Sequence, residues 1–164
     1  MTIEDDLHKI AEQEETLRFD TFDLAAAGVL GRLLCDLATE RNLPVAIDIT
    51  FHSMPVFYAA LPGSTPDNAS WIRRKRNMVL RYFRSSYASG LSLQKQGKTI
   101  ESNGLSAEDY ASHGGSFPIY VNGTGCIGAA TVSGLPQRAD HNLVVEALAL
   151  MLGHEPDGLG LPDA

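Results

Sequence analysis

Apolar residues recur along the chain at helical spacing with polar residues between them, and this periodicity predicts several amphipathic helices. The helices are expected over residues 1–16, 23–42, 71–85, 86–98 and 136–152. The first of these is acidic, and a capping-box pattern at residues 106–109 predicts one further short helix. Gly153 and Pro156 end the last helix, so residues 154–164 are expected to form a loose tail.

Shorter stretches in which apolar and polar residues alternate predict two β-hairpins. Residues 45–49 and 56–61 form the first, and residues 117–121 and 124–133 form the second. Asn122-Gly123 lies between the strands of the second hairpin and favours a primed turn. Strands paired in hairpins and mixed with helices predict an α/β chain of the α+β type.

The helix predicted over residues 71–85 carries a cation on its apolar face. Each residue advances by about 100° around a helix. The apolar stripe then consists of Trp71, Ile72, Met78, Val79, Tyr82 and Phe83. Lys75 falls in the middle of that stripe, so it either reaches an anion in a cavity or subunit interface, or lays its stem along apolar surface with its ammonium in water.

The arginines around Lys75 admit two kinds of partner. They could contact nucleic acid, or they could face the acidic residues between positions 4 and 15 in the same or a neighbouring subunit. The acidic balance of the chain favours the protein partner.

His113-Gly114-Gly115 stands immediately before the second hairpin. Paired glycines permit positive φ angles and close approach of the backbone to another surface or to a ligand. The segment is therefore either a tight turn that holds a loop histidine, or a ligand contact in which His113 takes part.

The glycine-rich strand over residues 124–133 leads through Ser133 and Gly134 into the last helix. Projecting the buried stripe of that helix backwards predicts that Gln137, Asp140 and His141 lie on one side of its first turn. Polar side chains, free backbone N–H groups and the helix dipole then converge, which suits an anionic or polar group. Alternatively, Asp140 only stabilises the helix start and His141 is a packed histidine.

Composition limits the classes of protein that the chain resembles. Its 164 residues, 44% of them hydrophobic, are enough for one domain with one core, over residues 1–164. A formal charge of −7 argues against nucleic acid as a partner. The chain has no stretch near the roughly 20 apolar residues of a membrane span, and its acidic start is unlike a signal peptide, so a cytoplasmic protein without membrane contact is expected.

The two cysteines, Cys35 and Cys126, are expected to be free thiols, because neither belongs to a CxxC motif or has a partner at metal-ligand spacing. No metal site is predicted. A redox-sensing function through Cys126 is a minor alternative, since neither thiol has a basic neighbour in sequence. The motifs of serine hydrolases, P-loop nucleotidases and zinc proteases are absent from the sequence.

Several segments together resemble the haem-degrading domain family, in its small stand-alone branch of uncharacterised proteins related to GlcG and HbpS. The segments are Leu61-Pro62-Gly63, Pro66-Asp67-Asn68, Trp71-Ile72-Arg73-Arg74-Lys75, His113-Gly114-Gly115-Ser116-Phe117-Pro118-Ile119, Ile127-Gly128, Val132-Ser133-Gly134-Leu135-Pro136-Gln137 and Asp140-His141. The resemblance runs from about Phe22 to Gly153, and its C-terminal half is the more specific.

The resemblance implies a profilin-like architecture, in which an antiparallel sheet of about five strands is covered by helices on both faces. It also implies a homo-oligomer, and it associates the chain with haem binding or haem degradation. Haem iron needs an axial ligand, which His113 or His141 could supply.

We therefore expect a cytoplasmic homo-oligomer that binds a small ligand of haem or organic-acid type at the edge of its core. The expected ligand-binding residues are Lys75, Gly114, Gly115, Ser133, Gly134 and Gln137. In an enzyme, His141 or His113 would be the general acid or base, and Asp140 would orient a histidine or hold a proton. The alternative is an assembly or adaptor protein without chemistry, in which Lys75 and the arginines contact another subunit or partner.

Overall fold

A computed structural model describes residues 1–163 and contains one four-stranded antiparallel sheet in the order β2-β1-β4-β3. The strands are β1 (Ala46–Phe51), β2 (Met54–Ala60), β3 (Ser116–Val121) and β4 (Gly125–Ser133). Both predicted hairpins therefore form, and β1 and β4 pair to join them into one sheet.

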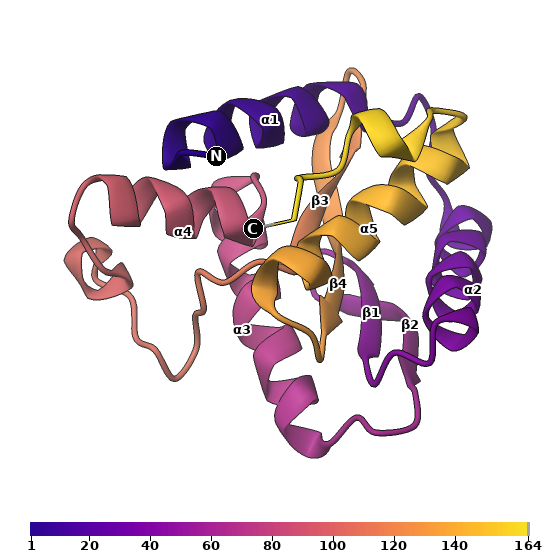
Figure 1. Cartoon of the computed structure of the whole chain (residues 1–164). Coiled ribbons are helices and arrows are strands. Elements are labelled where there is room, and N and C mark those ends of the chain that lie inside the picture. Colours follow the sequence, from indigo (N-terminus) through magenta and orange to yellow (C-terminus); the bar gives the residue numbers. More distant parts are fainter. Residues whose placement is uncertain (164) are drawn as a thin grey trace.

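Helices cover both faces of the sheet (Figure 1). They are α1 (Ile3–Thr16), α2 (Leu24–Glu40), α3 (Pro66–Tyr82), α4 (Ser86–Lys95) and α5 (Gln137–Leu152), with short 3-10 helices η1 (Ile100–Asn103) and η2 (Pro156–Gly158). Helices α2 and α5 lie side by side on one face, whereas α3 packs on the other face and α1 lies against α4.

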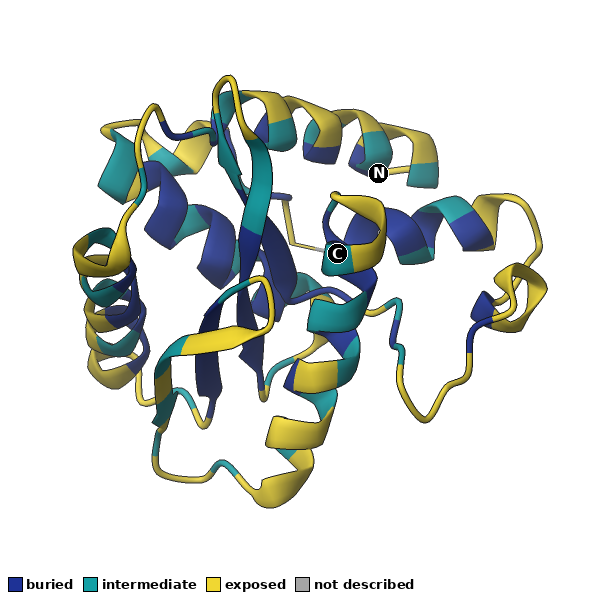
Figure 2. Ribbon diagram, turned by 180° about the vertical axis from the view of Figure 1, so that it is seen from behind, coloured by how far each residue is buried: buried dark blue, intermediate teal, exposed yellow. Residues whose placement is uncertain are grey.

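Strand β1 shows how alternation divides the two faces. Ile47 and Ile49 enter the main core between the sheet, α2 and α5. Asp48 points to the opposite face, where its Oδ2 accepts a hydrogen bond of 2.9 Å from Arg76 on α3. The central strands are buried from both sides as a result, while the edge strand β2 stays largely open to solvent (Figure 2).

Two sequence expectations for secondary structure are corrected. The sheet has four strands where the resemblance implied about five; outside these strands, Phe19 makes a single bridge to Val121. Residues 106–109 form a turn and no helix; the turn closes with a hydrogen bond of 3.0 Å from the Tyr110 N–H to the Ser106 carbonyl.

Two local geometries also differ from expectation. The turn at Asn122-Gly123 is not primed, because only Gly123 has a positive φ, of 79°. The Asn122 N–H instead donates to the Phe19 carbonyl. Helix α3 begins at Pro66, ahead of the predicted residue 71, and Thr65 caps it: Thr65 is extended, and its N–H donates to the Asn68 side chain in a capping box.

The C-terminal segment, expected to be loose, is packed against the rest of the molecule. Leu159 joins the main core, and Leu161 enters a smaller apolar cluster between α1 and α4. Backbone groups of Leu161 exchange two hydrogen bonds with the Asn142 side chain. The apolar side chains that follow Pro156 therefore anchor the segment by burial, although the segment has no helical periodicity that would have predicted it.

Within residues 1–163, none of the helices combines the length and the apolar character that crossing a bilayer requires.

Candidate functional site

The segment His113-Gly114-Gly115 immediately precedes β3 and lies beside the end of β4 and the start of α5. The Gly114 N–H donates to Oε1 of Gln137 at 3.1 Å, and the Gly115 carbonyl accepts from Val132. Gly115 has a φ of 133°, and a Cβ there would lie 2.7 Å from Nζ of Lys75. The two glycines therefore allow the backbone to approach the Lys75 side chain and the start of α5 closely.

Lys75 on α3 meets an acidic side chain of its own chain. Its Nζ lies 2.9 Å from Oδ2 of Asp140, at the start of α5, and 3.2 Å from the Val132 carbonyl oxygen on β4. The Leu135 N–H donates to the other carboxylate oxygen of Asp140 at 3.0 Å. Lys75 is only 3% exposed, so of the two alternatives for it the one in which it reaches an anion is confirmed, and its ammonium does not extend into open solvent.

Burial acts on both members of this pair. It lowers the pKa of the Lys75 ammonium and raises the pKa of the Asp140 carboxyl, because each charged form loses hydration. The attraction between Lys75 and Asp140 opposes both shifts. Removing one partner of a buried ion pair strongly destabilises the folded protein, because the other charge is left buried without a partner.

The ion pair lies in the wall of a cavity of about 260 Å³ between α3, the end of β4 and the start of α5. Six residues expected at the site line the cavity: Lys75, His113, Ser133, Gly134, Gln137 and Asp140. The remaining lining residues are Asp67, Asn68, Trp71 and Leu135. Sequence reasoning did not assign Asp67, Asn68 and Trp71 to the site, although Asn68 and Trp71 follow helical spacing with Lys75 on one face of α3.

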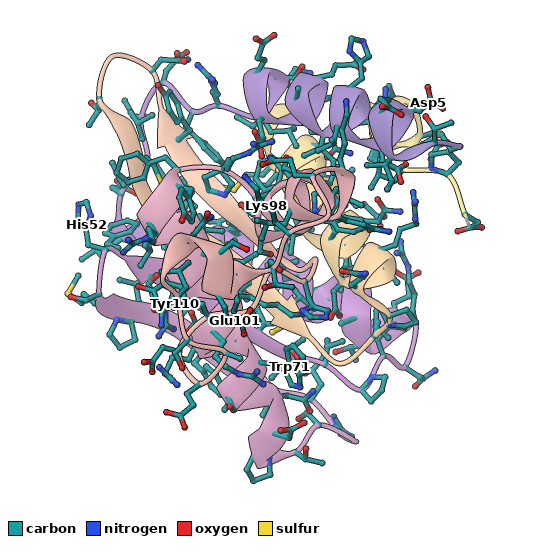
Figure 3. All side chains as sticks on the ribbon, turned by 90° about the vertical axis from the view of Figure 1, so that its left-hand side faces the viewer. Asp5, His52, Trp71, Lys98, Glu101 and Tyr110 are labelled. Atoms are coloured by element: carbon teal, nitrogen blue, oxygen red, sulfur yellow. The ribbon has the colours of Figure 1, made fainter. Side chains whose placement is uncertain are left out.

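Trp71 and His113 form a wall between this polar cavity and a larger one. Their rings are in edge contact, with centroids 5.1 Å apart. The second cavity has a volume of about 490 Å³ and a mostly apolar lining that includes Leu93, Ile100 and Tyr110. Trp71, Lys98, Glu101 and Tyr110, which all line it, lie on the same side of the molecule in Figure 3.

His113 is exposed, although its imidazole is partly desolvated, and it favours its neutral form. Burial lowers the pKa of its imidazole, and the positive charges of Lys75 and Arg74 lower it further. A neutral imidazole has a free ring nitrogen that can bind a metal or accept a proton.

His141 does not line the cavity with Gln137 and Asp140; of the two alternatives for it, the packed histidine is confirmed. It is 1% exposed, and its Nε2 lies 2.8 Å from Oε1 of Gln13 on α1. The rings of Tyr87 and Phe117 pack against it. Consecutive helical residues diverge by about 100°, which separates His141 from Asp140.

The α3 arginines make their contacts within the chain, mostly away from the acidic N-terminal helix. Arg76 pairs with Asp48, and Arg73 with Asp109. The Arg74 guanidinium lies over the Trp71 ring, 4.1 Å from its centroid. The acidic helix α1 pairs elsewhere in the chain, through Asp6 with Arg138 and Glu4 with Lys95.

The cysteines are both partly buried free thiols, and burial raises the pKa of each. In the described residues there is no group of three or more histidine, cysteine, aspartate or glutamate side chains that could hold a metal ion.

Comparison with known proteins identifies the family. The sequence matches the family described as "Haem degrading protein HbpS-like" over residues 22–149. The chain belongs to this HbpS-like family. It is 78% identical over 161 residues to a UPF0303 protein of Rhizobium rhizogenes, an alignment that covers 98% of this chain and 99% of that protein.

Two solved structures resemble the HbpS-like chain, one in sequence and fold and the other in fold alone. The crystal structure of the Ybr137w protein gives a TM-score of 0.82 at 31% identity and covers 90% of this chain and 87% of that one. A structure described as the PduOC:Heme complex gives a TM-score of 0.67 at 16% identity, with coverage of 79% and 94%, and shows likeness of fold.

Proposed function

We propose that the protein binds a planar, carboxylate-bearing ligand against His113, and that haem is the ligand to test first. One observation carries the proposal: the His113 imidazole lies in the wall shared by the polar cavity and the larger apolar cavity. Membership of a haem-degrading family supports the choice of haem, as does the fold shared with a protein solved as a heme complex.

The residues around the apolar cavity fit a porphyrin. The polar cavity of about 260 Å³ lies below the roughly 300–1,000 Å³ of pockets for drug-sized ligands, whereas the apolar cavity of about 490 Å³ lies within that range. Trp71 and Ile100 supply apolar walls, and Arg74 and Lys98 supply cations for carboxylates. His113 is the residue that would hold the haem iron.

In this arrangement the bound haem supplies the iron chemistry, and the protein supplies position. His113 presents a neutral ring nitrogen because burial and two nearby cations lower its pKa. The edge contact with Trp71 restricts the orientation of the imidazole.

The test is a haem titration of the purified protein, followed by visible absorption. We expect a saturable Soret shift at a stoichiometric ratio that is lost in His113→Ala and kept in His8→Ala, which removes an exposed histidine of α1. A weak, non-saturating change would remove haem from the proposal. Loss of the shift in His141→Ala with His113→Ala unaffected would place the ligand elsewhere. Degradation is tested separately, by adding a reductant to the complex.

A further inference from the structure

The polar cavity on the other side of the Trp71–His113 wall has hydrogen-bond donors without partners. Lys75 has three N–H donors, of which two are used, by Asp140 and by the Val132 carbonyl. Among the described residues no third partner is present. Since Lys75 lines the cavity, an acceptor placed there can reach its ammonium.

The neighbouring donors point to the same chemistry. Gln137 uses its side-chain oxygen to accept from Gly114, so its amide NH₂ is free for a ligand. The start of α5 adds the unpaired N–H groups and the positive dipole end of a helix of 16 residues.

Asp140, which lies inside the site, does not cancel the preference of these donors for an anionic ligand. Both carboxylate oxygens of Asp140 already accept hydrogen bonds, one from Lys75 and one from the Leu135 N–H. Asp67, the other carboxylate in the lining, is exposed on the first turn of α3, where water screens its charge.

We propose that the polar cavity is a binding site for a small monocarboxylate, separate from the haem site. Its carboxylate would accept hydrogen bonds from Lys75 and Gln137, and its short chain would lie against Trp71 and Leu135. A volume of about 260 Å³ corresponds to the liquid volume of about eight or nine water molecules at roughly 30 Å³ each. The site is therefore suited to a small organic acid.

The protein contains its own reporter for this site, because Trp71 is the single tryptophan of the chain and lines the cavity. The experiment titrates haem-free protein with propionate, with the uncharged isostere propionamide, and with chloride at equal ionic strength, and follows tryptophan fluorescence. We expect a saturable response to propionate, at least about tenfold weaker binding of propionamide, and no saturation with chloride.

Gln137→Glu is the deciding variant. It keeps a side-chain oxygen for the Gly114 N–H and adds a negative charge at the exposed start of a helix, where a carboxylate is tolerated. We expect it to weaken propionate binding by at least about tenfold and propionamide binding by less, because only propionate is also repelled by the added charge. Gln96→Glu, which adds the same charge at an exposed position outside this cavity, should leave propionate binding unchanged.

Lys75→Met should also abolish the propionate response if this variant folds. If Lys75→Met does not fold, the result for Gln137→Glu alone tests the proposal. Equal responses to propionate and propionamide, or an unaltered propionate response in Gln137→Glu, would overturn the proposal. Because haem binding is read from the Soret band and depends on His113, either proposal can fail while the other stands.

Discussion

His141 is a titratable side chain that the fold keeps uncharged. Burial, reinforced by the positive charge of Arg138, lowers its pKa to about 3. Its Nδ1 is buried and has no hydrogen-bond partner among the described residues, while Nε2 is paired with Gln13. Protonation of this imidazole is therefore coupled to unfolding.

The stability of the protein should depend on pH through His141. Between the folded pKa of about 3 and the ordinary value of 6.5, the unfolded chain binds a proton that the folded chain does not bind. The free energy of unfolding should therefore fall as pH is lowered from about 7 to about 5, at up to about 1.4 kcal/mol per pH unit. Urea unfolding at several pH values measures this slope.

Two variants isolate the contribution of this histidine. His141→Gln cannot be protonated but keeps a donor for Gln13, so it should show a smaller slope with pH. His8→Gln, at an exposed position of α1, should keep the slope of the unaltered protein. Identical slopes in all three proteins would contradict the assignment.

At the scale of elements, the C-terminal segment joins α1 to α5. The Gln13 side chain donates to the Leu159 carbonyl at 2.7 Å and also faces His141. Leu161 packs with Ile10 and Leu91, in the cluster between α1 and α4. The last residues thus support the helix that contributes Asp140 and Gln137 to the site.

We expect Leu161→Ala to destabilise the protein by about 2–5 kcal/mol, because it leaves a cavity at a position that is 4% exposed. Leu150→Ala, at a position 42% exposed on α5, should have a much smaller effect. Chemical denaturation of both variants measures the difference. Equal effects would mean that the segment is loosely attached in solution.

At the scale of the whole molecule, homo-oligomerisation is a proposal that the resemblance raised. The assembly hypothesis used Lys75 as a subunit contact, but Lys75 is paired with Asp140 inside its own chain. Its burial leaves it unavailable to a second subunit. Other surfaces must supply the contacts of any assembly.

Lys75→Met should therefore leave the molar mass from light scattering unchanged, while it lowers stability by about 3–5 kcal/mol through the unpaired Asp140. Arg73→Met, which removes a half-exposed pair with Asp109, is the matched control and should cost at most about 1 kcal/mol. A changed mass with unchanged stability would restore the assembly hypothesis for Lys75.

The sequence by itself determined the local elements and the family. Periodicity fixed the main helices and both hairpins, because it reflects which side of each element is buried. The position of Lys75 on an apolar stripe marked it as unusual, and His113-Gly114-Gly115 marked the start of β3 as a place of close approach. Each of these features depends only on residues close together in the sequence, so the sequence pattern of one segment is enough to predict it.

Only the tertiary structure decided what these residues meet. Asp140 is the partner of Lys75 although 65 positions separate them, and Asn68 and Trp71 reach the cavity from the same distant helix. His141 was placed wrongly because the first turn of α5 has protein on more than one side, so a polar residue there can face α1 as well as a cavity. Such pairings follow from how α3, α5 and the C-terminal segment pack together, which no periodicity within one segment records.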